Sequence, residues 1–268
     1  MADLDVGDLA RRNPRTARSR GFAIRYEDVG EGAAVVLVPG FLQSAADWRE
    51  TGYVDRIAGR RRVVTVDPLG HGQSDKPHDW EAYRVPDVAG DIVAVMDAAG
   101  IERAAMWGYS RGGRLAAIAA VEFPDRVAAL IVGGAALSRP LEPVDPIPPW
   151  IEALLRGDWA ALWRVAPLAN EYQQYFERVN DPRVMGAVAL GARKSQYAID
   201  LSRVSAPALI YCGGDDAVGP DFASAMRIDA QTLGVEPHIL DGRDHAGAFV
   251  DIDSVIPLVL AHLEAAGV

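Results

Sequence analysis

Short apolar runs alternate with helix-like segments along almost the whole chain, and this alternation restricts the possible fold more than any other feature. Two of the runs, Ala33–Val38 and Arg62–Val66, are nearly continuous, which is typical of strands buried on both faces of a parallel sheet. The full pattern predicts strands over 22–27, 33–38, 62–66, 104–107, 127–132, 208–212 and 237–240, and helices over 85–98 and 255–266. We therefore predict an α/β fold, with a mostly parallel central sheet and helices on both faces. Residues 22–27 alternate as an edge strand does.

One long segment interrupts the alternation. Five prolines lie between residues 140 and 149, so this stretch suits neither a helix nor a central strand. Large apolar residues then recur at roughly helical spacing until the strand pattern resumes near residue 206. We predict a core formed by residues 21–138 and 201–268, with a small helical cap inserted over residues 139–200.

The N-terminal region is rich in arginine, with five arginines between residues 11 and 20. A twin-arginine export signal needs an apolar segment next, but Gly21–Tyr26 is short and is interrupted by Arg25. We predict that residues 1–20 form a flexible, basic, solvated arm.

Composition limits the partners and the compartment. Among 268 residues, 37 are acidic and 27 basic, and the net charge of −10 argues against a general nucleic-acid-binding protein. No stretch approaches the 18 apolar residues of a membrane helix. Cys212 is the single cysteine, which excludes an internal disulfide and a metal site built on cysteines. We expect a cytoplasmic protein whose partner is a small molecule.

The pentapeptide Gly108–Gly112 carries the first chemical signal. It reads G-x-S-x-G, and it lies between an apolar run and an alanine-rich helical stretch. A strand, a tight turn and a helix in this order form a nucleophile elbow, which presents the serine hydroxyl beside the free N–H groups of the new helix. Ser110 is therefore the candidate nucleophile.

A serine hydroxyl needs a general base and a group that orients it. His245 follows the last predicted strand, and histidine is the residue type that titrates near neutral pH. Asp215 and Asp216 both follow the strand predicted over 208–212, so either carboxylate could accept the far imidazole N–H. Asp244 adjoins His245 in sequence, and adjacent side chains rarely face each other well enough.

Two backbone N–H groups are expected to bind the oxyanion. One belongs to Arg111, directly after the nucleophile, and the other to Phe41 in the loop after the first buried strand, because Pro39 has no N–H. The Phe41 ring could equally be a pocket wall or part of the core. The segment Asp67–Asp75 contains Asp, His and Asp, but its glycines and proline favour a structured turn over a metal site. We expect neither a metal nor a cofactor.

Taken together, these segments resemble the α/β-hydrolase superfamily. The matching pieces, in chain order, are Val38-Pro39-Gly40-Phe41, Asp67–Asp75, Gly108–Gly112, Gly213-Gly214-Asp215-Asp216 and Asp244-His245. The resemblance implies a triad of Ser110, Asp216 and His245, since the family acid usually lies three residues after the glycine. It also implies a cap over the site. Many relatives have His-Gly where this chain has Pro39-Gly40, which changes the pocket floor.

The resemblance is strongest to bacterial carboxylesterases and lactone hydrolases. Serine at position 110 argues against the haloalkane dehalogenase and epoxide hydrolase branches, which use a carboxylate nucleophile. We expect a serine hydrolase that cleaves a carboxylic ester or lactone. Two alternatives remain open: the same triad acting on a C–C bond, an amide or peroxide, and a ligand receptor with negligible turnover.

Overall fold

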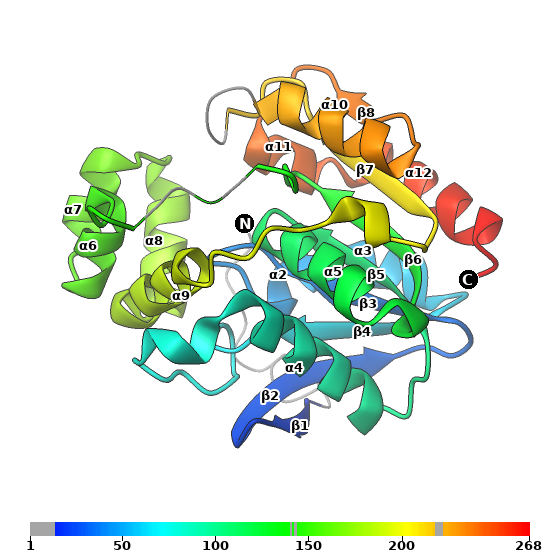
Figure 1. Cartoon of the computed structure of the whole chain (residues 1–268), viewed down its shortest axis with the longest axis horizontal. Coiled ribbons are helices and arrows are strands. Elements are labelled where there is room, and N and C mark those ends of the chain that lie inside the picture. The colour runs from blue at the N-terminus through cyan, green and yellow to red at the C-terminus, as the bar shows by residue number, and fades with distance from the viewer. Residues whose placement is uncertain (1–13, 140, 142–143, 218–221) are drawn as a thin grey trace.

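The computed structural model describes residues 14–139, 141, 144–217 and 222–268. An eight-stranded sheet runs through the described residues in the order β1-β2-β4-β3-β5-β6-β7-β8 (Figure 1). The β1–β2 and β2–β4 pairs are antiparallel, and all other pairs are parallel. The strands are β1 (Arg15–Ser19), β2 (Phe22–Val29), β3 (Ala34–Val38), β4 (Arg62–Asp67), β5 (Ala104–Tyr109), β6 (Val127–Gly133), β7 (Ala208–Gly213) and β8 (His238–Leu240). The predicted α/β fold is confirmed.

Helices cover both faces of this sheet. Neighbouring residues of one strand enter different cores: Val36 packs with residues of α4, α5 and α10, and Val35 packs with residues of α2, α3, α11 and α12. The α-helices are α2 (Ala45–Glu50), α3 (Tyr53–Ala58), α4 (Val85–Ala98), α5 (Arg111–Glu122), α6 (Pro149–Leu155), α7 (Trp159–Val165), α8 (Asn170–Val179), α9 (Pro182–Lys194), α10 (Phe222–Leu233), α11 (His245–Val250) and α12 (Ile252–Ala265). Short 3-10 helices are η1 (Trp80–Tyr83), η2 (Pro124–Arg126) and η3 (Leu201–Arg203).

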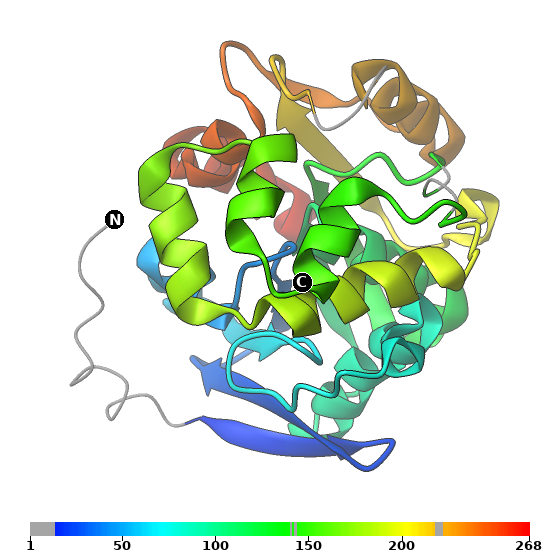
Figure 2. The same ribbon diagram turned by 90° about the vertical axis from the view of Figure 1, so that its left-hand side faces the viewer.

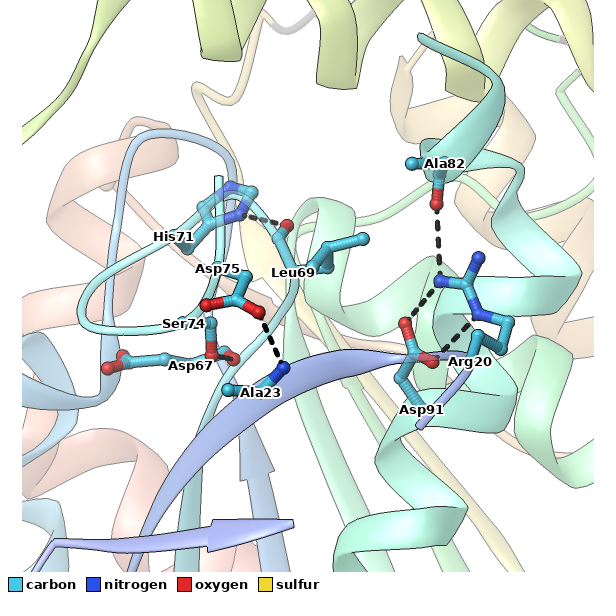
Figure 3. Close-up of polar contacts among 9 residues, drawn as sticks. All are labelled: Arg20, Ala23, Asp67, Leu69, His71, Ser74, Asp75, Ala82 and Asp91. Carbon is cyan, nitrogen blue, oxygen red and sulfur yellow. Dashed lines mark hydrogen bonds and ion pairs between the residues drawn. The ribbon is translucent and has the colours of Figure 1, made fainter. Parts of the chain in front are cut away.

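The prediction of a flexible arm is wrong for residues 15–20. Residues 15–19 form β1, the edge strand, with Ala17 buried and the neighbouring side chains turned toward solvent. Arg20 follows and donates from Nε to Asp91 Oδ1 of α4 at 2.9 Å and from Nη2 to Ala82 O at 3.2 Å (Figure 3). A strand pairing and a buried carboxylate therefore fix residues that composition alone suggested were free. Residues 1–13 lie outside the described residues, and β2, predicted as an edge strand, lies inside the sheet.

Four helices, α6 to α9, lie between β6 and β7 in sequence, and we call them the helical insertion. Figure 1 shows α6, α7 and α8 beyond one end of the sheet, and Figure 2 views the molecule from their side. Helix α6 packs on α9, and α9 packs on η1. Pro140 and Pro143 of the proline-rich connection lie outside the described residues. The division into core and cap stays a prediction.

No helix among the described residues is both long and apolar enough to cross a bilayer.

Candidate active site

Ser110 occupies a strained turn between β5 and α5. Its φ of 53° and ψ of −121° are unusual for a residue with a side chain. The flanking glycines make the turn possible, because a Cβ at Gly108 would lie 2.1 Å from Gly112 O and a Cβ at Gly112 would lie 2.1 Å from Val38 O. The chain therefore folds here as a nucleophile elbow, with Ser110 at the carboxyl end of β5.

Asp216 and His245 meet at the same edge of the sheet. His245 Nδ1 lies 2.7 Å from Asp216 Oδ2, and because the carboxylate only accepts, Nδ1–H is the donor. The Asp216 side chain is fully buried, and that of His245 is 29% exposed. This bond leaves His245 Nε2 unprotonated in the neutral ring, as a general base requires.

Backbone contacts hold the two loops together. A Cβ at Gly213 would lie 2.1 Å from Arg243 O, and Asp215 N donates to that same oxygen at 2.9 Å. Asp215, the alternative acid, is exposed. His245 is the first residue of α11, where a loop was expected. Among the two candidate acids, the structure therefore brings Asp216 to the histidine.

Ser110 and His245 are linked through Tyr109, which precedes the serine. The Tyr109 hydroxyl donates to the backbone oxygen of His245 at 2.6 Å, and the two rings are 5.3 Å apart. Within the described residues, no hydrogen bond joins the Ser110 hydroxyl to the His245 ring. Catalytic hydrogen bonds are often long before substrate binds, so we expect this contact to form in the substrate complex.

The two candidate oxyanion donors are both available. Neither Phe41 N nor Arg111 N donates to another described residue. The loop that carries Phe41 is close to the nucleophile, because a Cβ at Gly40 would lie 3.3 Å from Ser110 Cβ. Gly40 N donates to Gln43 Oε1 at 2.9 Å, which holds the loop in this shape. The Phe41 ring packs edge-on to His71 and Trp150 and is partly buried.

The segment Asp67–Asp75 forms a structured turn. Asp67 is buried and accepts from Ala45 N at 2.7 Å and Gln73 N at 2.8 Å, although burial raises its pKa to about 6. Asp75 accepts from Ala23 N at 2.7 Å (Figure 3). Gly72, with φ +50°, is required because a Cβ there would lie 2.1 Å from the Asp67 carboxyl carbon. These oxygens serve the backbone, as the sequence suggested.

His71 lies within this turn and is buried. Its Nδ1 lies 3.2 Å from Leu69 O, so the ring donates from Nδ1 (Figure 3). Burial, together with the charge of Arg111, lowers the pKa of His71 to about 3. The folded protein therefore holds a neutral imidazole that the unfolded chain would protonate below about pH 6.5.

This histidine is expected to make the protein acid-sensitive. Above about pH 6.5 its protonation does not affect stability; below that value the unfolded chain binds a proton that the folded chain cannot. The free energy of unfolding then falls by up to about 1.4 kcal/mol per pH unit, down to about pH 3. His71→Gln removes this dependence. Urea unfolding of both proteins at pH 7, 5.5 and 4 should show the gap between them shrinking as the pH falls; a constant gap would contradict a buried neutral His71.

A cavity of about 360 Å³ lies elsewhere, and no candidate catalytic residue lines it. Its walls come from β2, the end of β4, the start of α2 and α8, including Tyr26, Ala45, Gln73, Tyr175 and Arg178.

Comparison with known proteins agrees with this architecture. Residues 33–165 match the family described as the alpha/beta hydrolase fold. This chain belongs to the alpha/beta hydrolase superfamily. The superfamily supports an enzyme of the hydrolase class, and it accounts for the elbow at Ser110 and the mostly parallel sheet.

The individual relatives of this chain carry the names of different activities. Epoxide hydrolase B of Mycobacterium tuberculosis is 37% identical over 102 residues, which are 38% of this chain and 28% of that protein. The first curated relatives match over only 28 to 39% of their own length. A thermophilic esterase from Thermogutta terrifontis has a TM-score of 0.76 at 21% identity, covering 95% of this chain and 99% of that one. Est816, described as an N-acyl homoserine lactone degrading enzyme, has a TM-score of 0.74 at 23% identity, covering 92% and 99%.

The sequence did not predict two features of the site. Tyr109 occupies a variable position of the pentapeptide, and its link to His245 crosses 136 residues, so no local pattern indicates it. Arg111 was expected to act only through its backbone N–H group, and no role was predicted for its side chain. An arginine is normally exposed, but all three of its side-chain nitrogens are buried.

Proposed function

We propose that this protein is a serine hydrolase that cleaves a carboxylic ester or lactone through an acyl-enzyme intermediate. The strongest support comes from one observation. His245 Nδ1 lies 2.7 Å from the buried Asp216 carboxylate, at the sheet edge where the elbow presents Ser110. An oriented base at this edge has the role that a serine nucleophile requires. Serine at position 110 favours this chemistry over that of the epoxide hydrolase relative.

The proposed reaction has two steps. Ser110 Oγ attacks the carbonyl carbon while His245 Nε2 takes its proton and then returns it to the leaving oxygen. The N–H groups of Phe41 and Arg111 hold the negative oxygen, and Asp216 stabilises the imidazolium. Water activated by His245 then attacks the acyl carbon, which releases the acid and restores the serine.

The chemistry needs neither metal nor cofactor. We propose that the helical insertion acts as a cap, since its Trp150 packs on the Phe41 ring beside the oxyanion loop. A cytoplasmic location remains part of the proposal, since one buried cysteine can form no internal disulfide.

Turnover of two substrate types tests the proposal. The wild-type protein is incubated with p-nitrophenyl butyrate and, separately, with an N-acyl homoserine lactone. We expect sustained release of acid over many turnovers from at least one of them. A single slow release with the product retained would instead indicate a ligand receptor. Turnover confined to an amide or a C–C bond, or dependent on added peroxide, would contradict the ester assignment.

Tyr109→Phe is expected to lower kcat while leaving KM unchanged. The substitution keeps the ring but removes the hydroxyl that holds the His245 backbone, so the base is positioned less well. Loss of one hydrogen bond of about 1.4 kcal/mol corresponds to roughly tenfold in kcat. Tyr211→Phe is the matched control, because the Tyr211 hydroxyl accepts from Trp107 Nε1 and not from a catalytic loop. Steady-state kinetics on p-nitrophenyl butyrate measure both; equal effects would exclude a positioning role.

A further inference from the structure

The Arg111 guanidinium is buried without a partner. Its Nε, Nη1 and Nη2 atoms are all inaccessible, and none makes a hydrogen bond to any described residue. The residue as a whole is partly exposed, so the side chain enters the protein from a surface next to Ser110. A buried charge without a partner is among the most costly features that a folded protein can keep.

Among the described residues, no carboxylate offsets this charge. Burial lowers the pKa of Arg111 to about 10, so the group stays protonated at neutral pH. Within the described part of the chain, the charge interaction that favours its protonated form comes from Tyr83, whose hydroxyl donates to Pro77 O at 2.6 Å. Arg111 in turn lowers the pKa of His71. The guanidinium therefore lies within electrostatic range of His71 and Tyr83.

His71 and Tyr83, the groups within electrostatic range, cannot satisfy this side chain. A guanidinium has five N–H donors. Since His71 donates from Nδ1, its Nε2 has one lone pair, and the Tyr83 oxygen could accept one more bond. At least three donors and the whole positive charge would remain.

Arg114, one turn later on α5, shows the contrast. Its Nη1 donates to the backbone oxygens of Ala136, Leu137 and Arg139 at 2.7, 3.2 and 3.1 Å. The carboxylate of Asp229 also acts on its charge. The same helix can therefore satisfy a buried arginine with protein groups, and it does not do so at Arg111.

We propose that Arg111 binds a carboxylate carried by the substrate, so that the ester or lactone cleaved by this enzyme is an acidic one. This inference rests on the proposed function and adds the substrate class. A carboxylate offers two oxygens that match the guanidinium fork and supplies the missing negative charge. Because Arg111 directly follows the nucleophile, a substrate held at Ser110 lies next to the origin of this side chain.

The proposed oxyanion loop lies beside His71, which is within electrostatic range of the guanidinium. The Phe41 ring contacts both His71 and Trp150, with centroids 6.5 and 6.0 Å away. Phe41 and Trp150 are both partly buried. Since the guanidinium nitrogens are covered, a covering side chain must move for the carboxylate to reach them, and the Phe41 ring, which packs on His71, is one candidate.

A binding experiment tests the inference without any turnover. The Ser110→Ala protein is titrated with glutarate and with neutral glutaramide at constant ionic strength, and thermal unfolding is recorded. We expect glutarate alone to raise the Tm, in a saturable way. Arg111→Met in the same background should abolish the rise, and Arg111→Lys should keep only part of it because the fork is lost. A rise that survives Arg111→Met, or no saturable rise, would overturn the inference.

A matched pair of esters extends the test to catalysis. For the Ser110-containing enzyme we expect kcat/KM for p-nitrophenyl hydrogen glutarate to exceed that for p-nitrophenyl butyrate by at least about tenfold. The ratio should collapse to about one in Arg111→Met. Ester turnover without this preference would refute the substrate class and leave the proposed function standing. Glutarate binding through Arg111 without any ester turnover would refute the proposed function and leave the carboxylate site at Arg111 standing.

The stability of the ligand-free protein separates binding from support of the fold. Arg111→Met replaces an uncompensated buried charge with an apolar chain of similar length, so its Tm should be higher than that of the wild type. A clear decrease would mean that the guanidinium stabilises the fold, which would contradict its assignment to a ligand.

Discussion

Replacing Ser110 with alanine is expected to lower kcat/KM for p-nitrophenyl butyrate by about 10⁶-fold, to the level left by substrate binding and the oxyanion donors. The variant removes one oxygen and keeps Cβ, so the elbow and its positive φ are retained. The hydroxyl makes no hydrogen bond among the described residues, and we expect the Tm to stay close to that of the wild type. The size of the loss matters, because a loss this large is expected only when the attacking serine or its histidine base is removed.

The control is Ser205→Ala. Ser205 is exposed in the connection before β7, far in sequence from the elbow, and its loss should leave activity within twofold of the wild type. Both variants are purified identically and assayed at high enzyme concentration, which limits the contribution of contaminating esterases. Residual activity of more than about 1% in Ser110→Ala would show that another group attacks the carbonyl carbon.

Asp216→Asn is expected to lower kcat by about 10⁴-fold. The amide is neutral and cannot stabilise the imidazolium that forms when His245 takes the serine proton. Its NH₂ group can also donate to Nδ1, which would place the ring proton on Nε2, where it blocks the base. The substitution conserves shape, so the buried site should accommodate it. Steady-state kinetics with circular dichroism separate the loss of chemistry from loss of fold.

Asp215→Asn is the matched control for this experiment. Asp215 is adjacent in sequence and chemically identical, but its side chain is exposed, and its contact with Arg243 O uses its backbone N–H. We expect kcat within about twofold of the wild type. The reverse order of effects would assign the orienting acid to Asp215 and would require a different arrangement of the loop after β7.

The sequence predicts the central sheet well because parallel strands buried on both faces leave continuous apolar runs. It also places the candidate residues together, since Phe41, Ser110, Asp216 and His245 each follow a strand that ends at one edge. The edge strand β1 escapes prediction because its short sequence contains two arginines and a single buried residue, Ala17. Pairing with β2 decides its structure, and that pairing is a tertiary property.

The polar contacts of the site are harder to predict than its residues. The choice between Asp215 and Asp216 depends on how Arg243 O meets the chain after β7, which one-dimensional spacing does not encode. The Tyr109 hydroxyl and the Arg111 guanidinium depend on which side of the elbow each side chain takes. Residue type even misleads for Arg111, because a charged side chain is expected at the surface.

Covalent labelling shows directly which residue attacks the substrate. The wild-type protein is incubated with a fluorophosphonate, which transfers its phosphonyl group to an activated serine, and intact-protein mass spectrometry is followed by peptide mapping. We expect the mass increase of a single phosphonyl group, located on Ser110 and absent from Ser110→Ala, with labelling strongly slowed in Asp216→Asn. Label on a different residue, or an unlabelled protein that still hydrolyses esters, would contradict this expectation.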